Sequence, residues 1–185
     1  MLSPCLFCSA ECCKNLYITV TIFDVIRIAE KTGKKPDEFA VLYPLKLINF
    51  DNDTVLELYD RKYPAEHILC LKSHPCIFLK GTSCTIHDFA PSACKTFPKK
   101  IGGGFSGFCP FPASLLFRVL GTNMPVNYAN ELSAYREIVA SWNRKKGKKK
   151  DCMKFLIQHA KDSSALSSAG TGSRRGYGPD SESIS

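Results

Sequence analysis

Four cysteines stand within nine residues near the start of the chain, in the stretch CLFCSAECC, residues 5 to 13. The whole chain of 185 residues holds ten cysteines. A chain of this length can bury enough apolar surface for one domain without covalent staples. The cysteines are therefore explained by their chemistry, as disulfides, redox thiols, core residues or ligands for a soft metal ion, and each use constrains the fold differently.

The expected cellular compartment reduces the number of possible roles of the cysteines. Cys5 follows only Met1-Leu2-Ser3-Pro4, which holds no secretory signal. No apolar run approaches the roughly 20 residues that a membrane-spanning helix needs. We therefore expect a cytoplasmic protein without a membrane segment, in which thiols stay reduced. That environment favours metal binding or catalysis over a disulfide framework.

The net charge of +8 is concentrated in one segment. Six basic residues form RKKGKKK, Arg144 to Lys150, and the rest of the chain holds 19 basic and 17 acidic residues. The segment could contact the phosphates of a nucleic acid, although no aromatic residue is interleaved with its lysines to stack on bases. The other interpretation is that the segment is a solvated helix end. A protein partner for this chain is also possible from the sequence.

Local patterns predict an α+β fold, a single small domain of short β-hairpins and a few helices organised round a cysteine-rich metal centre. Residues 15–21 read as a strand. Thr21 and Asp24 form a capping-box pattern that begins a helix, and Gly33 ends it. One hairpin is predicted over residues 44–60, with its turn at 51–53. A second over 76–87, with its turn at 80–83, would bring Cys76 and Cys84 toward one another.

The second half of the chain reads as loop, then helices. Residues 97–112 are rich in glycine and proline, which suits an irregular loop. Asn130 caps a helix with an apolar face of Leu132, Tyr135, Val139 and Trp142, Gly147 interrupts it, and Asp151 starts another. We divide the chain into a cysteine-cluster metal-binding region, 1–112, a helical part of the same domain, 113–162, and a disordered tail, 163–185.

Eight cysteines form the predicted metal-ligand set. Cys5 and Cys8 have the two-residue spacing of a chelate loop, and six more follow in turn or loop settings, namely Cys12, Cys13, Cys76, Cys84, Cys94 and Cys109. Eight thiolates suffice for two four-coordinate sites. In an extended backbone, adjacent Cys12 and Cys13 would face opposite sides and serve different ions or a bridged pair. Zinc, iron and an iron–sulfur cluster all accept thiolates, so the metal stays open.

Other candidates receive structural interpretations. Cys70 and Cys152 fall outside the pattern and are expected to be packed as small hydrophobic residues. His87 could replace a thiolate, but a hydrogen-bonded surface histidine is favoured. Cys5 and Cys8 could also form a dithiol redox pair, although the βαβ context of a thioredoxin-like motif is missing.

Two long stretches together resemble a known family. CLFCSAECC followed by VTIFDVIRIAEKTG, and later CIFLKGTSCTIHDFAPSACKTFP, are similar to the YkgJ-type cysteine-cluster family of zinc- or iron-chelating proteins over most of residues 5–109. The resemblance implies metal binding by the eight cysteines, with Cys109 the additional member. His87, Ala90 and Lys95 stand where the family commonly has an aromatic residue and two arginines. If those arginines contact an anionic substrate or cofactor in relatives, the same contact is not expected here.

Three functions compete at this point. The first is a non-enzymatic metal-binding protein of unknown specific activity. The second rests on the resemblance alone: proteins related to the family include a flagellin lysine N-methylase, so a metal-dependent protein lysine methylase using S-adenosylmethionine is the enzymatic alternative. Its catalytic and cofactor-binding residues are unknown in this sequence. The third is a nucleic-acid-binding protein acting through Arg144 to Lys150.

Overall fold

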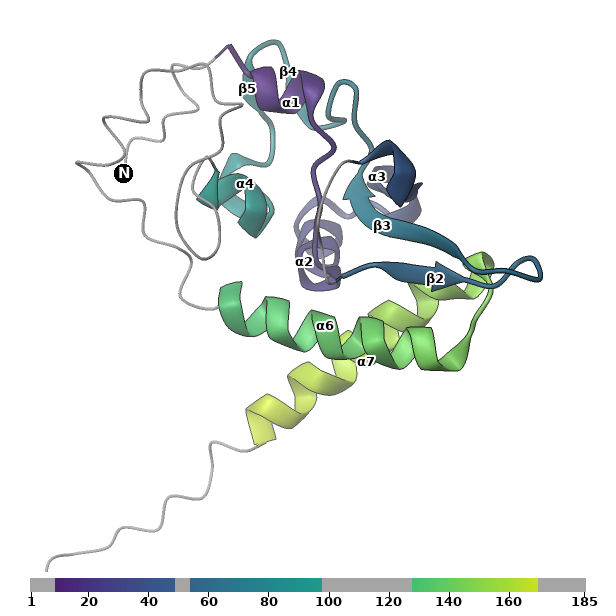
Figure 1. Cartoon of the computed structure of the whole chain (residues 1–185). Coiled ribbons are helices and arrows are strands. Elements are labelled where there is room, and N and C mark those ends of the chain that lie inside the picture. Colours follow the sequence, from purple (N-terminus) through teal and green to yellow (C-terminus); the bar gives the residue numbers. More distant parts are fainter. Residues whose placement is uncertain (1–8, 49–53, 98–127, 170–185) are drawn as a thin grey trace, which may run out of the picture.

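Strand β3 (Ala65–Leu71) lies at the centre of the fold, between β1 (Ala40–Pro44) and β2 (Leu56–Leu58) in an antiparallel sheet. This computed structural model describes residues 9–48, 54–97 and 128–169, of which 164–169 as backbone only. Helices α2 (Ile22–Thr32), α6 (Tyr128–Lys145) and α7 (Lys149–Ala169) lie on one side of the sheet (Figure 1). The expected α+β class is confirmed.

Helix α2 begins and ends at the predicted residues. The Asp24 amide donates to Thr21 Oγ1 over 3.2 Å, and the Thr21 amide donates to Asp24 Oδ2 over 3.0 Å, which completes the capping box. Gly33 ends the helix with φ 68°, a left-handed conformation that glycine adopts without steric cost. Between them, Ile22, Val25 and Ile28 are fully buried against the sheet.

The hairpin predicted over residues 44–60 is wrong. Pro44 ends β1, a 3-10 turn η2 (Leu45–Leu47) follows, and residues 49–53 lie outside the described ranges. Strands β1 and β2 do not pair with each other. Both pair with β3, with Leu42 opposite Leu69 and Leu56 opposite His67. The chain therefore forms its hairpin between β2 and β3, a strand that the sequence analysis did not identify.

The strand predicted over residues 15–21 is shorter than expected. Asn15 ends helix α1 (Glu11–Asn15), and Thr19 forms an isolated bridge with Cys70. The Val20 amide donates to Leu69 O over 3.0 Å, and the Leu71 amide donates to Ile18 O over 2.9 Å. The segment thus runs alongside the end of β3 that β2 does not cover.

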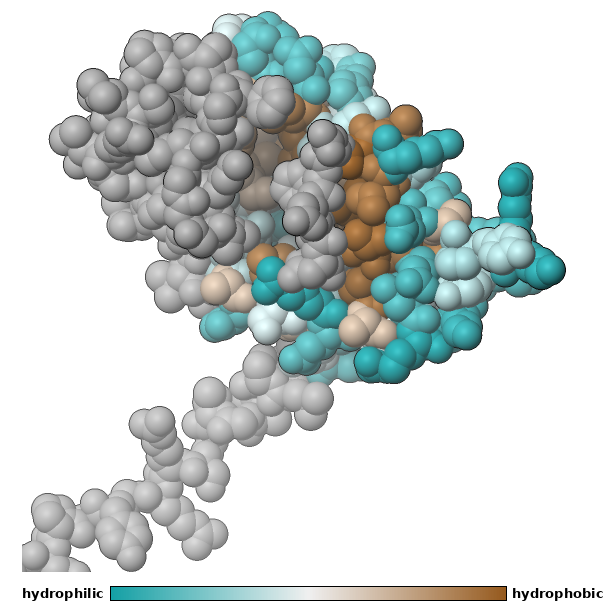
Figure 2. All heavy atoms as spheres, in the orientation of Figure 1, coloured by the Kyte–Doolittle hydropathy of each residue, from teal (hydrophilic) through white to brown (hydrophobic). Residues whose placement is uncertain are grey.

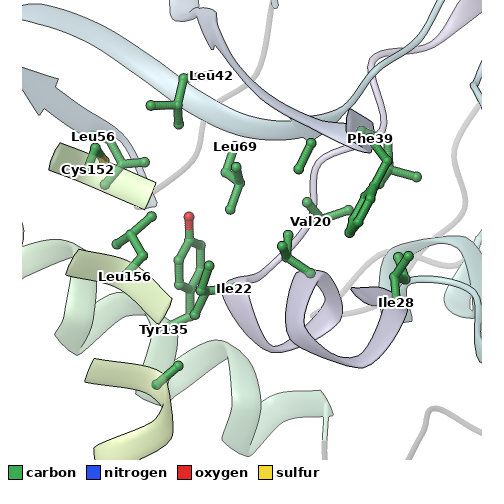
Figure 3. Packing of buried hydrophobic residues seen from close by; sticks show 14 of the residues in the cluster. Val20, Ile22, Ile28, Phe39, Leu42, Leu56, Leu69, Tyr135, Cys152 and Leu156 are labelled. Carbon is green, nitrogen blue, oxygen red and sulfur yellow. The ribbon is translucent and has the colours of Figure 1, made fainter. Parts of the chain in front are cut away.

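The main core lies between the sheet and the three long helices. Figure 3 shows Ile22 of α2, Tyr135 of α6 and Leu156 of α7 packed beneath Leu69 of β3. Tyr135, Trp142 and Leu156 are at most 1% exposed. The opposite face of β3 has a smaller apolar cluster of Ile48, Ile68 and Cys70, with Tyr17 and Tyr43 against it. Because both faces are covered, β3 is buried from His67 to Leu71.

Helices α6 and α7 carry the predicted apolar faces but have different ends. Helix α6 starts at Tyr128, so the prediction that Asn130 caps it is wrong, and α7 starts at Lys149, ahead of Asp151. Gly147 separates them as predicted, and a Cβ there would overlap the Trp142 ring, so the position requires glycine. Helix α7 continues to Ala169, beyond Ser163, where the predicted tail starts. Residues 170–185 lie outside the described part.

The remaining short elements carry cysteines. They are α1, the two-stranded hairpin of β4 (Leu79–Lys80) and β5 (Ser83–Cys84), the 3-10 turn η3 (His87–Phe89) and α4 (Ser92–Thr96). A further short helix, α3 (Pro36–Phe39), leads into β1. In Figure 1, α1, β4 and β5 lie at the end of the molecule away from α6 and α7, and α4 lies between them and the start of α6. Among the described residues, no helix is both long enough and apolar enough to span a membrane.

Candidate metal centre

Cys12 and Cys13 both lie on α1 and point to the same place. Their sulfur atoms are 3.9 Å apart, so the expectation that the pair faces opposite sides is wrong, because the backbone is helical there and not extended. The hydrogen bond between the two thiols lowers the pKa of Cys12 to about 7 and raises the pKa of Cys13. Ala10 precedes the helix in a left-handed conformation, φ 62°, which costs a non-glycine residue about 1–2 kcal/mol.

Cys76 is joined to α1 through the backbone. Its amide donates to Cys13 O over 2.7 Å, and its own carbonyl accepts from the Leu79 amide at the start of the hairpin. Cys76 is 5% exposed, and burial raises the pKa of its thiol. One hydrogen bond therefore links the N-terminal cysteines to a cysteine more than sixty residues later.

Cys84 sits on the hairpin opposite Leu79. The hairpin over residues 76–87 is confirmed with shorter strands than predicted, and Gly81 makes the turn with φ 63°. The Thr85 amide donates to Phe78 O over 2.9 Å, which holds the two arms together below the strands. Cys76 and Cys84 are close enough for the charge of Cys84 to raise the pKa of Cys76, as the predicted turn implies.

Cys94 lies in the middle of α4, and Asp24 fixes the start of this helix. Asp24 Oδ1 accepts the Ser92 amide over 3.0 Å and the Arg27 guanidinium over 3.2 Å. Arg27 then pairs with Glu131 of α6 at 2.8 Å. Asp24 is 1% exposed, so this carboxylate is a buried junction between α2, α4 and α6. From the sequence we assigned Asp24 only its capping role.

The five described ligand candidates lie near enough to one another for their charges to interact. Burial raises the pKa of Cys94 well above its usual value, and the charges of Cys76, Cys12 and Cys84 raise it further. Cys13, Cys84 and Cys94 all pack at the edge of the main core, which contains Cys76. Thiols from α1, the hairpin and α4 are therefore brought together. Cys5, Cys8 and Cys109 lie outside the described residues.

The donor set suits a soft cation by its chemistry. Burial and mutual repulsion raise the pKa values of Cys76, Cys84 and Cys94, and a bound cation would replace the protons of such thiols. Thiolate sulfur is the preferred ligand of zinc and of iron–sulfur clusters. Within 9–48, 54–97 and 128–169, however, no group of three or more cysteine, histidine or acidic side chains is arranged to hold a metal ion.

Cys70 and Cys152 lie in the apolar interior. Both are 0% exposed, Cys70 in the cluster on the outer face of β3 and Cys152 in the main core. Burial raises the pKa of each thiol to about 12. They are packed as small hydrophobic residues, as the sequence predicts. His87 lies in η3 between Cys84 and Cys94, with its side chain 45% exposed.

The comparison with protein families covers both cysteine-bearing stretches. Residues 4–110 match the family described as "CxxCxxCC: Putative zinc- or iron-chelating domain". The chain belongs to this family. A search of curated proteins and a search of solved structures found no match.

The matched range separates two parts of the molecule. It includes all eight cysteines of the predicted ligand set, the sheet and helix α2 with Asp24. Helices α6 and α7 and the basic segment lie beyond it. The sheet of the matched region therefore packs against two helices, α6 and α7, that the family match does not include.

Proposed function

We propose that this protein binds zinc or iron through thiolates of the eight-cysteine set, in one or two sites that join α1, the β4–β5 hairpin and α4. The observation that carries the proposal is the approach of two thiols of α1, Cys12 and Cys13, to three thiols more than sixty residues later, Cys76, Cys84 and Cys94. The family description supports the same class of ligand.

Three features support Cys94 as a ligand and not as a packed thiol. It lies at the edge of the core with three other candidate thiols near it. Its helix is only five residues long, too short to be stable alone. The start of that helix is held by the buried Asp24 carboxylate, an arrangement that fixes the direction of a ligand-bearing segment.

The bound metal would hold the thiolates in place and offset their repulsion. The apparent binding free energy of a structural zinc site, about 10–16 kcal/mol, is comparable with the stability of a whole domain. We therefore assign the metal a part in folding the cysteine-bearing elements. No observation in the described residues favours S-adenosylmethionine-dependent methylation, so we propose no reaction.

The test is elemental analysis together with an absorption spectrum of protein purified without oxygen. Iron with visible absorption bands assigns an iron–sulfur cluster, and zinc without colour assigns a zinc site. Serine at Cys8 or Cys94 should lower the metal content per folded molecule. Cys152→Ala is the matched control, because it also removes one thiol, but from the apolar core. The metal content of this variant should stay at the wild-type value.

Two results would contradict the proposal. One is wild-type protein, purified without oxygen or reconstituted with zinc or with iron and sulfide, that holds less than one metal equivalent. The other is an equal loss of metal in Cys8→Ser, Cys94→Ser and Cys152→Ala, because the thiols would then not differ in role.

A further inference from the structure

The fold joins the basic segment to the tip of the β2–β3 hairpin. The Tyr59 amide donates to Gly147 O over 3.0 Å, and the Lys149 amide contacts both carboxylate oxygens of Asp60 at 3.2 Å. On the adjoining turn of α6, Asn143 Oδ1 accepts the Glu57 amide of β2, and Asn143 Nδ2 donates to Val55 O just before β2, each over 2.9 Å. Two segments more than eighty residues apart thus form one continuous surface.

This surface, which we call the basic hairpin surface, is strongly positive. Its basic side chains are all exposed and are Arg61, Lys62, Arg144, Lys145, Lys146, Lys148, Lys149 and Lys150. Two carboxylates lie beside these side chains and keep their charge: Asp60 accepts the Lys149 amide, and Glu57 accepts the Tyr59 hydroxyl over 2.7 Å. Asp151 beside the segment and Glu66 of β3, opposite Glu57, are further exposed acidic residues, so the basic side chains outnumber the acidic ones by eight to four. The hydrophilic end of the molecule at the right of Figure 2 corresponds to the hairpin.

The same fold supplies the aromatic rings that the basic segment lacks in sequence. Tyr63 is 74% exposed, and Lys62 Nζ lies 5.7 Å from the centre of its ring. Lys146 Nζ lies 6.0 Å from the Tyr59 ring, across the junction between the two segments. Exposed tyrosine among lysines and arginines is the combination that binds unpaired bases and their phosphates together.

We propose that the basic hairpin surface binds single-stranded nucleic acid, with its phosphates on the lysines and a base stacked on Tyr63. Charge complementarity selects a polyanion, and the exposed ring selects one with unpaired bases over a duplex, whose bases are already stacked. This binding is independent of the metal centre, since its residues lie outside the cysteine-bearing elements. RNA and DNA share the chemistry that the surface recognises.

The experiment measures binding of the full-length protein to fluorescein-labelled oligouridylate and oligodeoxythymidylate by anisotropy, between about 50 and 200 mM salt. We expect affinity that falls steeply with salt. Replacing Lys148, Lys149 and Lys150 with alanine should reduce the magnitude of the slope of log K against log salt by about 2, at about 0.7 per lost phosphate contact. The control is alanine at Lys31, Lys80 and Lys161, which removes the same charge from elements elsewhere and should leave binding unchanged.

A second pair of variants tests the ring. Tyr63→Ala should weaken binding about 5- to 150-fold with little change in salt slope, and Tyr63→Phe should restore it, because stacking needs the ring and not the hydroxyl. Equal loss in the two lysine triples would overturn the proposal by showing a general charge effect. Tighter binding to vesicles of phosphatidylcholine and phosphatidylserine, or to duplex DNA, than to either oligonucleotide would also overturn it.

Discussion

Helix α6 has eighteen residues, and its buried residues include Tyr135, Ile138, Val139 and Trp142. Helix α1 has five residues, and none of its own residues is buried. The same contrast extends to their surroundings. The sheet, α2, α6 and α7 share one apolar core, while α1, the β4–β5 hairpin, η3 and α4 are elements of two to five residues each. Isolated helices shorter than about 12 residues are marginal in water.

The difference shows that the two regions have different sources of stability. Apolar burial at about 25 cal/mol per Å² accounts for the packed region. In the cysteine-bearing region Cys76 lies in that core and Cys13, Cys84 and Cys94 lie at its edge, where ordering the thiols brings repulsion and desolvation. A metal ion bound by the thiolates would turn this unfavourable contribution to the free energy of folding into a favourable one. The proposed site would therefore account for the stability of the short elements around it.

Removing the metal should produce the largest difference between the cysteine-bearing region and the packed region. We expect a chelator to raise the hydrogen-exchange rates of the α1 and α4 amides by several orders of magnitude, because the proposed site supplies most of their stability. Amides of β3 should keep their protection, since β3 is covered on both faces. Exchange followed by mass spectrometry checks this, and an equal rise in β3 and α4 would show that the regions are not separate.

A substitution at Trp142 should destabilise the packed region and leave the cysteine-bearing region unaffected. Trp142→Ala should lower the free energy of unfolding by about 3–5 kcal/mol. The variant loses the contact with Phe155, 5.2 Å between ring centres, and the hydrogen bond from Nε1 to Glu57 O. Denaturant unfolding measures the loss, and Trp142→Phe, which keeps a ring, should cost less. Metal content per folded molecule should not change, and a parallel loss of metal would contradict the separation.

Asp24 connects the two regions, so its substitution should affect both. Asp24→Asn removes the charge that accepts the Ser92 amide and the Arg27 guanidinium. Hydrogen bonds to charged groups contribute about 1.5–3 kcal/mol, so we expect a destabilisation of about 2 kcal/mol by denaturant unfolding. Competition with a chromophoric chelator should show metal affinity about 10- to 100-fold weaker, as for other residues that orient ligands.

Glu131→Gln is the matched control for Asp24→Asn. It breaks the next contact along the same network, the pair of Glu131 with Arg27. Burial raises the pKa of Glu131 in spite of Arg27, so ionising this carboxyl costs more in the folded chain than in the unfolded chain, and the carboxylate adds little stability at neutral pH. The change should stay below about 1 kcal/mol. Equal metal loss in both variants would show that Asp24 has no special part in placing α4.

Locality decides which parts of this structure the sequence could predict. Helix α2 was predicted because Thr21, Asp24 and Gly33 act within a few residues of each other. Strand β3 was missed because it is covered on both faces and so lacks the alternation that identifies a half-buried strand. Without β3, the pairing of β1 and β2 with a third strand could not be inferred.

The candidate site follows the same rule. Chelate spacing identified the cysteines, and the turn at Gly81 placed Cys76 near Cys84. The pairing of Cys12 with Cys13 was not predicted, because the sequence analysis considered an extended backbone where the chain forms the short helix α1. The bond from the Cys76 amide to Cys13 O links residues distant in the sequence. The bond from Ser92 to Asp24 is equally remote. No local pattern reports such contacts.

The smallest expected effect distinguishes packing from polar bonding in the core. Tyr135 is 1% exposed, its hydroxyl points into the apolar interior in Figure 3, and that oxygen has no hydrogen-bond partner among the described residues. Burial also raises the pKa of Tyr135, so the hydroxyl stays neutral. Tyr135→Phe removes a polar group whose desolvation is uncompensated and keeps the ring. We therefore expect stability unchanged or increased by up to about 1 kcal/mol in denaturant unfolding. A loss greater than about 1 kcal/mol would show that the hydroxyl is bonded in solution, and that the packed region too depends on a specific polar contact.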